Sequence, residues 1–101
     1  MPRIRTHPGE VLREEFLKPL GLSANALALA LRVPATRIGD ILRVEKPRAI
    51  SADTAIRLAR YFGTSAEFWL NLQSAYDLSR ALAEHGTAIE RDVHPREEIA
   101  A

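Results

Sequence analysis

The chain has 101 residues, enough for one small domain, and 47% of them are hydrophobic while 27% are charged, which is the balance of a globular rather than a disordered protein. No apolar run has the length of a membrane span, no signal-peptide core follows the basic N-terminus, and cysteine is absent, so the sequence predicts a cytoplasmic protein without a membrane partner, disulfides or thiolate metal sites. Residues 1–50 hold nine Lys and Arg against five acidic residues, whereas residues 51–101 hold five Lys and Arg against eight acidic residues. This asymmetry favours nucleic acid as a partner of the first half. The alternative is that the charges are scattered over a solvated surface.

The first predicted helix runs from about Pro8 to Lys18. Val11, Leu12 and Phe16 fall on one face at helical spacing, and Leu20 follows just beyond the end. We expect this face to pack on the core.

A second helix is predicted after Ser23, whose hydroxyl is a natural N-cap. The segment that follows alternates Ala and Leu with a period of two, as a strand does. Both residues rank highest in helix propensity, so helix is the expected state, with Leu27 and Leu31 as its buried pair. Pro34 then ends this helix and opens the next.

The third predicted helix is short and covers about residues 35–42. Ile38, Ile41 and Leu42 give it a buried face. Gly39 lowers its helix propensity by about 1 kcal/mol relative to alanine. Packing must therefore hold this helix, and the small residue allows close approach of a neighbouring backbone.

Two further helices complete the predicted fold. One follows Ser51 and ends at Gly63, and the longer one begins with the capping-box spacing of Thr64 and Glu67. The apolar stripe of the longer helix consists of Phe68, Leu72, Ala75, Tyr76 and Leu82. From Gly86 onward the chain is polar and acidic, which predicts one domain over residues 1–85 and a flexible C-terminal tail over 86–101.

Two short helices joined by a tight turn inside an all-α domain are typical of the DNA-binding helix-turn-helix. Arg32 stands in the turn, where many such motifs have glycine because the position takes a positive φ. A non-glycine residue costs about 1 kcal/mol there. Val33 and Ala28 fill the space where the two helices cross.

The sequence resembles the Xre/Cro family of helix-turn-helix proteins, and more closely its HigA-type (VapI-like) antitoxins. The stretches that carry the resemblance are "HPGEVLREEFLKPLGLS" at 7–23, "VPATRIGDIL" at 33–42 and "ISADTAIRLARYFGTSAEFWLNLQSAYDL" at 50–78. The resemblance implies a five-helix, lambda-repressor-like domain, a homodimer and binding to a palindromic operator at the protein's own promoter. It also implies neutralisation of a HigB-type toxin, a RelE-like, ribosome-dependent mRNA endonuclease.

In a helix-turn-helix the second helix enters the major groove with its N-terminal end first. This geometry predicts that Pro34, Ala35, Thr36, Arg37 and Asp40 lie near base edges. Arg37 can pair with guanine, or else contact a phosphate or remain solvated. Asp40 can accept from cytosine, act as a negative selector, or form an ion pair with a neighbouring arginine.

Phosphate contacts are predicted at helix ends and in the loop after the recognition helix. The amides near Ser23 and Asn25 form a helix N-terminus. Arg43, Lys46 and Arg48 make the segment that follows the recognition helix basic. Such contacts give affinity and register rather than sequence choice.

The large aromatic residues of the last helix have two interpretations, a ligand site or packing. We favour packing in the core or in a dimer interface, which we predict to consist of Phe68, Trp69, Leu72 and Tyr76. The three histidines have no metal-ligand spacing, and the chain has no nucleophile motif or glycine-rich phosphate loop. We therefore expect no metal, no cofactor and no enzymatic activity.

Two other functions fit the same residues. One is a stand-alone Xre-type transcriptional regulator without a toxin. The other is a protein-interaction module whose helix-turn-helix no longer binds DNA. A neighbouring gene for a RelE-like toxin distinguishes the first from an antitoxin, and a salt-dependent gel shift tests the second.

Overall fold

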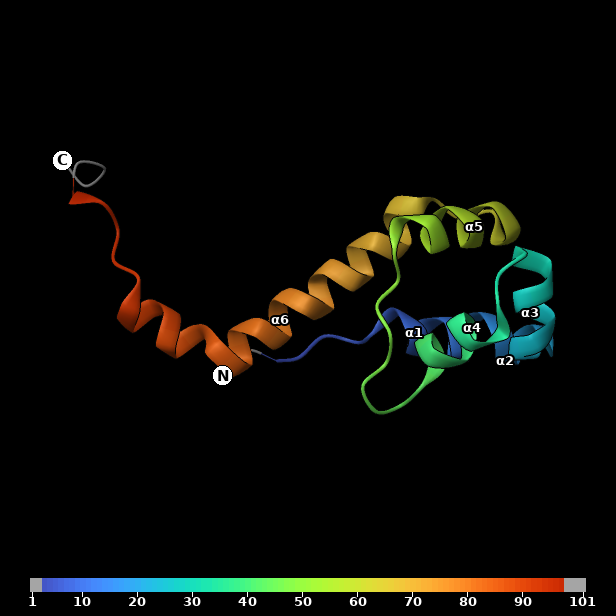
Figure 1. Cartoon of the computed structure of the whole chain (residues 1–101), viewed down its shortest axis with the longest axis horizontal. Helices are drawn as coiled ribbons and strands as arrows, with labels where there is room; N and C mark the ends of the chain where they lie inside the picture. Colours follow the sequence, from blue (N-terminus) through green and yellow to red (C-terminus); the bar gives the residue numbers. More distant parts are fainter. Residues whose placement is uncertain (1–2, 98–101) are drawn as a thin grey trace.

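The computed structural model describes residues 3–97, which form helices and connecting loops without any β-strand. Three consecutive segments form the first helical run: α1 (Pro8–Val11), the π-helix η1 (Leu12–Leu17) and α2 (Lys18–Leu20). Four further helices follow: α3 (Ala24–Leu31), α4 (Ala35–Leu42), α5 (Ala52–Phe62) and α6 (Ala66–Asp92). The expected five-helix, all-α architecture is confirmed (Figure 1).

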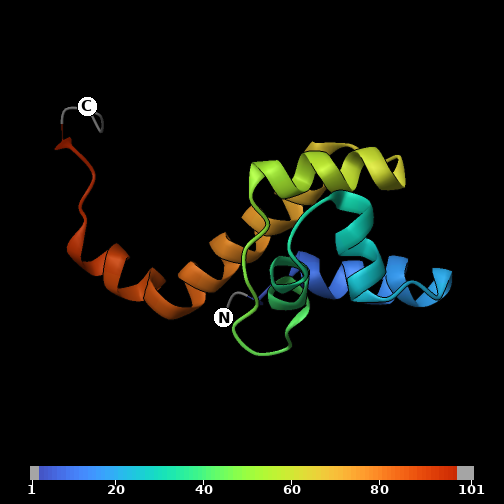
Figure 2. The same ribbon diagram turned by 45° about the vertical axis from the view of Figure 1, so that its right-hand side comes forward.

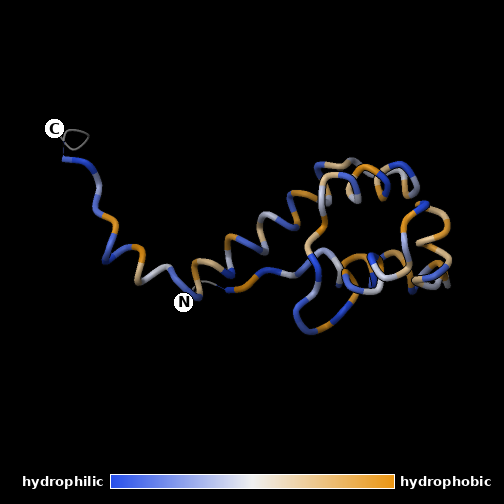
Figure 3. The backbone as a smooth tube through the Cα atoms, in the orientation of Figure 1, coloured by the Kyte–Doolittle hydropathy of each residue, from blue (hydrophilic) through white to orange (hydrophobic). Residues whose placement is uncertain are grey.

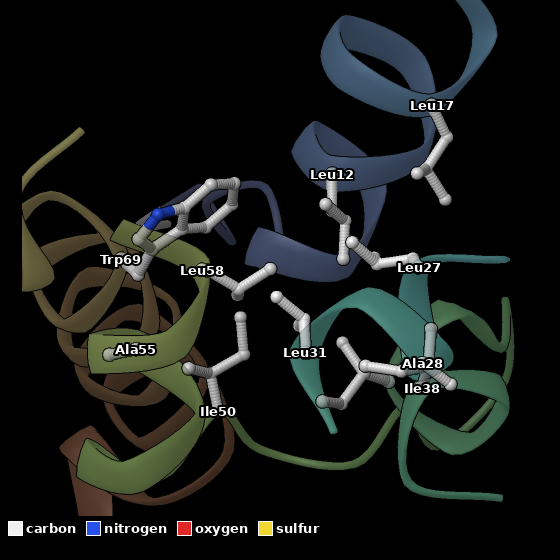
Figure 4. Packing of buried hydrophobic residues seen from close by; sticks show 11 residues of the cluster. Leu12, Leu17, Leu27, Ala28, Leu31, Ile38, Ile50, Ala55, Leu58 and Trp69 are labelled. Atoms are coloured by element: carbon white, nitrogen blue, oxygen red, sulfur yellow. The ribbon is translucent and has the colours of Figure 1, made fainter. Parts of the chain in front are cut away.

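The core lies where the first helical run, α3, α4 and α5 meet the beginning of α6. The side chains of Leu12, Leu27, Leu31, Leu58 and Trp69 point toward one another between these helices (Figure 4). The predicted burial of Leu27 and Leu31 in α3 and of Ile38 and Ile41 in α4 is confirmed, because all four are 4% exposed or less, while Leu42 is only partly buried against the core.

The first helical run departs from a regular α-helix. An α-helix would bring Leu12, Phe16 and Leu20 to one face, yet Leu20 is 64% exposed and Leu17 is buried instead. Each backbone hydrogen bond of a π-helix spans five residues instead of four. The residues that follow it are therefore rotated about the helix axis, as if one residue had been inserted. Leu12 and Leu17 therefore both reach the core, whereas Leu20 remains exposed.

The close crossing of α1 and α4 depends on a glycine that sequence reasoning did not select. A Cβ atom at Gly9 would collide with the carbonyl oxygen of Ile41. By contrast, a Cβ atom at Gly39 would meet nothing within 4 Å. The sequence predicted that a neighbouring backbone approaches Gly39, and this prediction is wrong. The backbone of this chain approaches Gly9 instead.

Most of the predicted helix caps are confirmed, and one is corrected. The hydroxyls of Ser23 and Ser51 accept from the amides of Ala26 and Thr54. In α6 the N-cap is Ser65 rather than Thr64. The Thr64 hydroxyl instead accepts the indole N–H of Trp69 at 2.8 Å.

Helix α6 is longer than the sequence predicts. It runs through Gly86 to Asp92, so residues 86–92 of the predicted tail are helical, and residues 98–101 lie outside the described part of the chain. Ser79 is the last buried residue along the described chain, and beyond it the helix projects from the body (Figures 1 and 2). The radius of gyration of 17.1 Å exceeds the value of about 13 Å expected for a compact chain of this length because of this projection.

Candidate nucleic-acid interface

Helices α3 and α4 form a helix-turn-helix whose turn has the predicted backbone. Arg32 has a φ of 60°, in the left-handed region, and the amide of Val33 donates to the carbonyl of Ala28 at 3.0 Å. Pro34 is extended and serves as the N-cap residue of α4. The turn therefore directs the N-terminus of α4 away from the core.

Neighbouring arginines cap the C-terminal ends of both helices of this motif. Arg57 on α5 donates to the carbonyl of Leu31, the last residue of α3, at 2.8 Å. Arg13 in η1 donates to the carbonyl of Leu42, the last residue of α4, at 2.7 Å. A cation at a helix C-terminus satisfies an unpaired carbonyl and interacts favourably with the helix dipole. Sequence reasoning missed both caps, since each joins residues more than 25 positions apart.

The outward face of α4 begins with two small, exposed residues, Ala35 and Thr36. The N-terminal turn of α3 also faces solvent, where Ser23 and Asn25 are exposed. The predicted base-reading and phosphate-binding ends of the motif are therefore both accessible.

Arg37 is held at the side of α4 by a residue from another helix. Its guanidinium lies 2.7 Å from the carboxylate of Asp53 in the first turn of α5. The same carboxylate oxygen accepts from Arg57 at 2.9 Å. Hydrogen bonds from Arg57 and then Arg37 lower the pKa of Asp53 below its ordinary value. The pair leaves Arg37 partly exposed and fixes its direction.

The basic loop folds back against the other end of α4. The amide of Arg48 donates to the carbonyl of Asp40 at 2.9 Å. The Asp40 carboxylate lies 3.8 Å from Arg48 and 4.0 Å from Arg43. Of the roles left open for Asp40, an ion pair with Arg43 is present, whereas Arg37 pairs with Asp53 instead.

Lys46 forms the outer bend of this loop. It is exposed and has a φ of 49°, and its carbonyl accepts from the guanidinium of Arg43 at 3.3 Å. The structure thus gathers three exposed cations, Arg43, Lys46 and Arg48, beside the C-terminal half of α4. A cluster of exposed cations beside a recognition helix can bind backbone phosphates.

A family model for the helix-turn-helix matches residues 14–69. Virulence-associated protein I of Dichelobacter nodosus is 62% identical over 81 residues, which cover 80% of this chain and 71% of that protein. Antitoxin HigA-1 of Vibrio cholerae is 40% identical over 70 residues, covering 69% of this chain and 64% of that protein. The Pseudomonas aeruginosa antitoxin HigA, solved with the higBA promoter, is 54% identical with a TM-score of 0.84, covering 92% of this chain and 98% of that one.

The chain belongs to the HigA-type antitoxins of the Xre/Cro helix-turn-helix family. The fold of antitoxin GraA, solved in complex with its operator, is also similar, with 46% identity, a TM-score of 0.87 and coverage of 95% of both chains. None of the helices in the part of this HigA-type chain that the structure describes is long and apolar enough to span a membrane.

A buried glutamine in this HigA-type chain connects the basic loop to α6. The side-chain oxygen of Gln73 accepts the amide of Ile50 at 2.8 Å, and its nitrogen donates to Asp77 at 3.0 Å. Gln73 is only 6% exposed. This bond fixes the exit of the loop, and no pattern in the sequence indicated it, because the partners are 23 positions apart.

The aromatic residues predicted to form a dimer interface serve different purposes. Trp69 is 0% exposed and packs 5.1 Å from the ring of Phe16, so of the two packing roles left open for it, the core is the one that it fills in the single chain. Phe68 is 38% exposed and rests edge-on against Trp69. Tyr76 contacts His7 edge-on at 4.8 Å, and Leu72 is half-buried against the core.

Proposed function

We propose that this protein represses its own operon by binding a palindromic operator through α4, and that it neutralises a HigB/RelE-like mRNA endonuclease as the antitoxin of a type II toxin–antitoxin pair in the cytoplasm. The observation that carries the DNA-binding part is that the N-terminal turn of α4 is exposed, and that the exposed cations Arg43, Lys46 and Arg48 lie beside the C-terminal half of the same helix. Two similar proteins, the Pseudomonas aeruginosa HigA and GraA, were solved with promoter or operator DNA.

The proposed contacts follow from this arrangement. Thr36 and Arg37 read base edges, while the helix N-terminus at Ser23 and Asn25 and the cations Arg43, Lys46 and Arg48 bind phosphates. Asp40 orients two of these cations, and Pro34 and Ala35 place the start of α4 in the groove.

A homodimer is the form that reads a palindrome. Two copies related by a two-fold axis place two α4 helices about 34–36 Å apart, one turn of DNA. Exposed apolar residues recur at helical spacing along the second half of α6 and at its C-cap, and they are Leu78, Leu82, Ile89 and Val93. Hydrophobic segments recur along this part of the chain in Figure 3. An apolar stripe on a helix that leaves the body marks an interface, and we place the second copy there, adjoining Phe68, Leu72 and Tyr76.

The DNA-binding proposal is tested by gel shift with the segment directly upstream of the gene, against a random duplex of equal length, at several salt concentrations. Tighter binding to the upstream segment with an affinity that falls as salt rises supports the repressor. Equal, weak binding to both duplexes supports a protein-interaction module instead.

The antitoxin proposal is tested by co-expression with the product of the adjacent gene. Rescue of growth, co-purification of the two proteins and inhibition of mRNA cleavage on ribosomes are expected. Operator binding without any such partner identifies a stand-alone Xre-type regulator.

A further inference from the structure

The two sides of the recognition helix α4 differ. On one side Arg37 reaches toward α5 and is tied to Asp53. On the other side Ala35 and Gly39 lie one helical turn apart and are both exposed. Over this turn of α4 the exposed side consists of backbone and a single methyl group, before Leu42 follows at the end of the helix.

Nothing within the described chain requires glycine at position 39. Gly39 is not among the residues with positive φ, whereas Gly21 and Gly63, which end α2 and α5, have φ values of 61° and 73°. A Cβ at Gly9 would strike Ile41, but a Cβ at Gly39 would meet nothing within 4 Å.

Folding alone therefore favours alanine over glycine at this position. Glycine in a helix interior loses more backbone entropy than alanine and makes the helix less stable. Helix α4 has only eight residues, so it has few other hydrogen bonds to compensate. The benefit of the glycine must then come from something outside the chain that approaches this side of α4.

We infer that Gly39 is a positioning residue for DNA: it leaves the backbone of α4 bare so that the wall of the major groove can come into van der Waals contact with it. An α-helix with its side chains is about 10–12 Å across and the major groove is about 12 Å wide. A side chain at position 39 uses up that clearance and moves Thr36 and Arg37 away from the base edges. This inference rests on the proposed operator binding.

The test compares Gly39→Ala and Gly39→Leu with the full-length wild-type protein. The DNA probe is the duplex that wild type selects from a random library, and a random duplex serves as reference. Both substitutions place good helix formers in α4, and we expect Gly39→Ala to raise Tm by about 2–8 °C. We expect Gly39→Ala to weaken binding to the selected duplex by about tenfold or more, Gly39→Leu to weaken it further, and both to bind the random duplex within about twofold of wild type.

Thr87→Ala is the matched control, because Thr87 is exposed on α6, far along the chain from α4. Thr87→Ala also introduces a better helix former. We expect this variant to bind the selected duplex with the affinity of wild type. If Gly39→Ala binds the selected duplex as tightly as wild type, or loses affinity equally for both duplexes, the positioning role is overturned while the proposed function stands. If wild type selects no sequence at all, both are overturned.

Discussion

The guanidinium of Arg37 on α4 and the carboxylate of Asp53 on α5 lie 2.7 Å apart, and Asp53 also accepts from Arg57. Because Arg57 caps α3 through the carbonyl of Leu31, one carboxylate links the recognition helix to the end of the helix that precedes it. These contacts favour one direction for the Arg37 side chain, which we propose reads a base edge.

This arrangement predicts that Arg37 and Asp53 act as a unit in base selection. Arg37→Ala is expected to cost about 1–3 kcal/mol on the operator and to relax choice at one base pair. Asp53→Ala should relax the same position less strongly, and the double variant should be no worse than Arg37→Ala, because the pair is coupled. Selection from a randomised operator library measures all three. Glu84→Ala, which breaks a comparable exposed pair with Arg80 on α6 at 2.8 Å, is the control. Equal losses of Arg37→Ala on operator and random DNA would show that the side chain touches only phosphate.

Lys46 is expected to contribute affinity without sequence choice. Lys46→Gln removes the charge but keeps a side chain at the same left-handed φ of 49°, so the cost of the bend is unchanged. Binding should weaken similarly on all duplexes, and the slope of log K against log salt should decrease by about 1. Filter binding over a salt series measures the slope. A loss confined to the operator would assign Lys46 to base reading.

His7 makes the stability of the fold depend on pH. It is 7% exposed, its Nδ1 accepts from the amide of Gly9 at 2.8 Å, and burial lowers its pKa below the ordinary value of 6.5 while the charge of Asp77 acts in the opposite direction. The unfolded chain therefore binds a proton before the folded chain does. The stability that depends on neutral His7 is fully present above about pH 6.5, and it is lost as the pH falls through the folded-state pKa of His7.

Thermal melts between about pH 8 and pH 5 measure this dependence. His7→Asn keeps an N-cap acceptor without a titrating group, so its Tm should vary less across this range than that of wild type. If both proteins show the same decline in Tm, groups other than His7 are responsible.

Gly9→Ala is expected to destabilise the fold by about 1–3 kcal/mol or more, because the added methyl group must displace α1 from α4 at the Ile41 carbonyl. Urea unfolding followed by circular dichroism measures the change. Gly86→Ala is the control, since a Cβ there makes only ordinary contact with Leu82 at 3.7 Å. A Gly9→Ala protein as stable as wild type would mean that α1 and α4 separate without cost.

Glutamate at Leu78 or Leu82 should shift the protein toward monomer, because either substitution places a charge in the proposed apolar interface. The helical signal should remain, because Leu78 is 61% exposed and Leu82 is 47% exposed in the single chain. Sedimentation measures the assembly, and Thr87→Glu on another side of α6 controls for the added charge. A wild-type protein that is monomeric well above the concentrations that bind operator would place the contact between subunits elsewhere.

Residue spacing predicted the helix-turn-helix well because its buried residues recur with the regular helical period, as Leu27 and Leu31 show. It failed at Leu17 because no sequence pattern marks a π-helical turn. It could not separate the two packing roles of Trp69, because the burial of this residue depends on Phe16 and Phe62, which only the fold brings next to it. Partners such as Asp53 were missed for the same reason. The candidate DNA-reading residues could be located, but what holds them could not.

The hydrogen bond between Gln73 and the amide of Ile50 has a thermodynamic consequence. It makes α6, which projects toward any partner, share a rigid joint with the loop that carries Lys46 and Arg48. A partner that changes the position of α6 at this joint is therefore expected to change the free energy of the proposed DNA binding at the loop. Linkage requires the reverse as well: DNA must alter the affinity for that partner by the same factor.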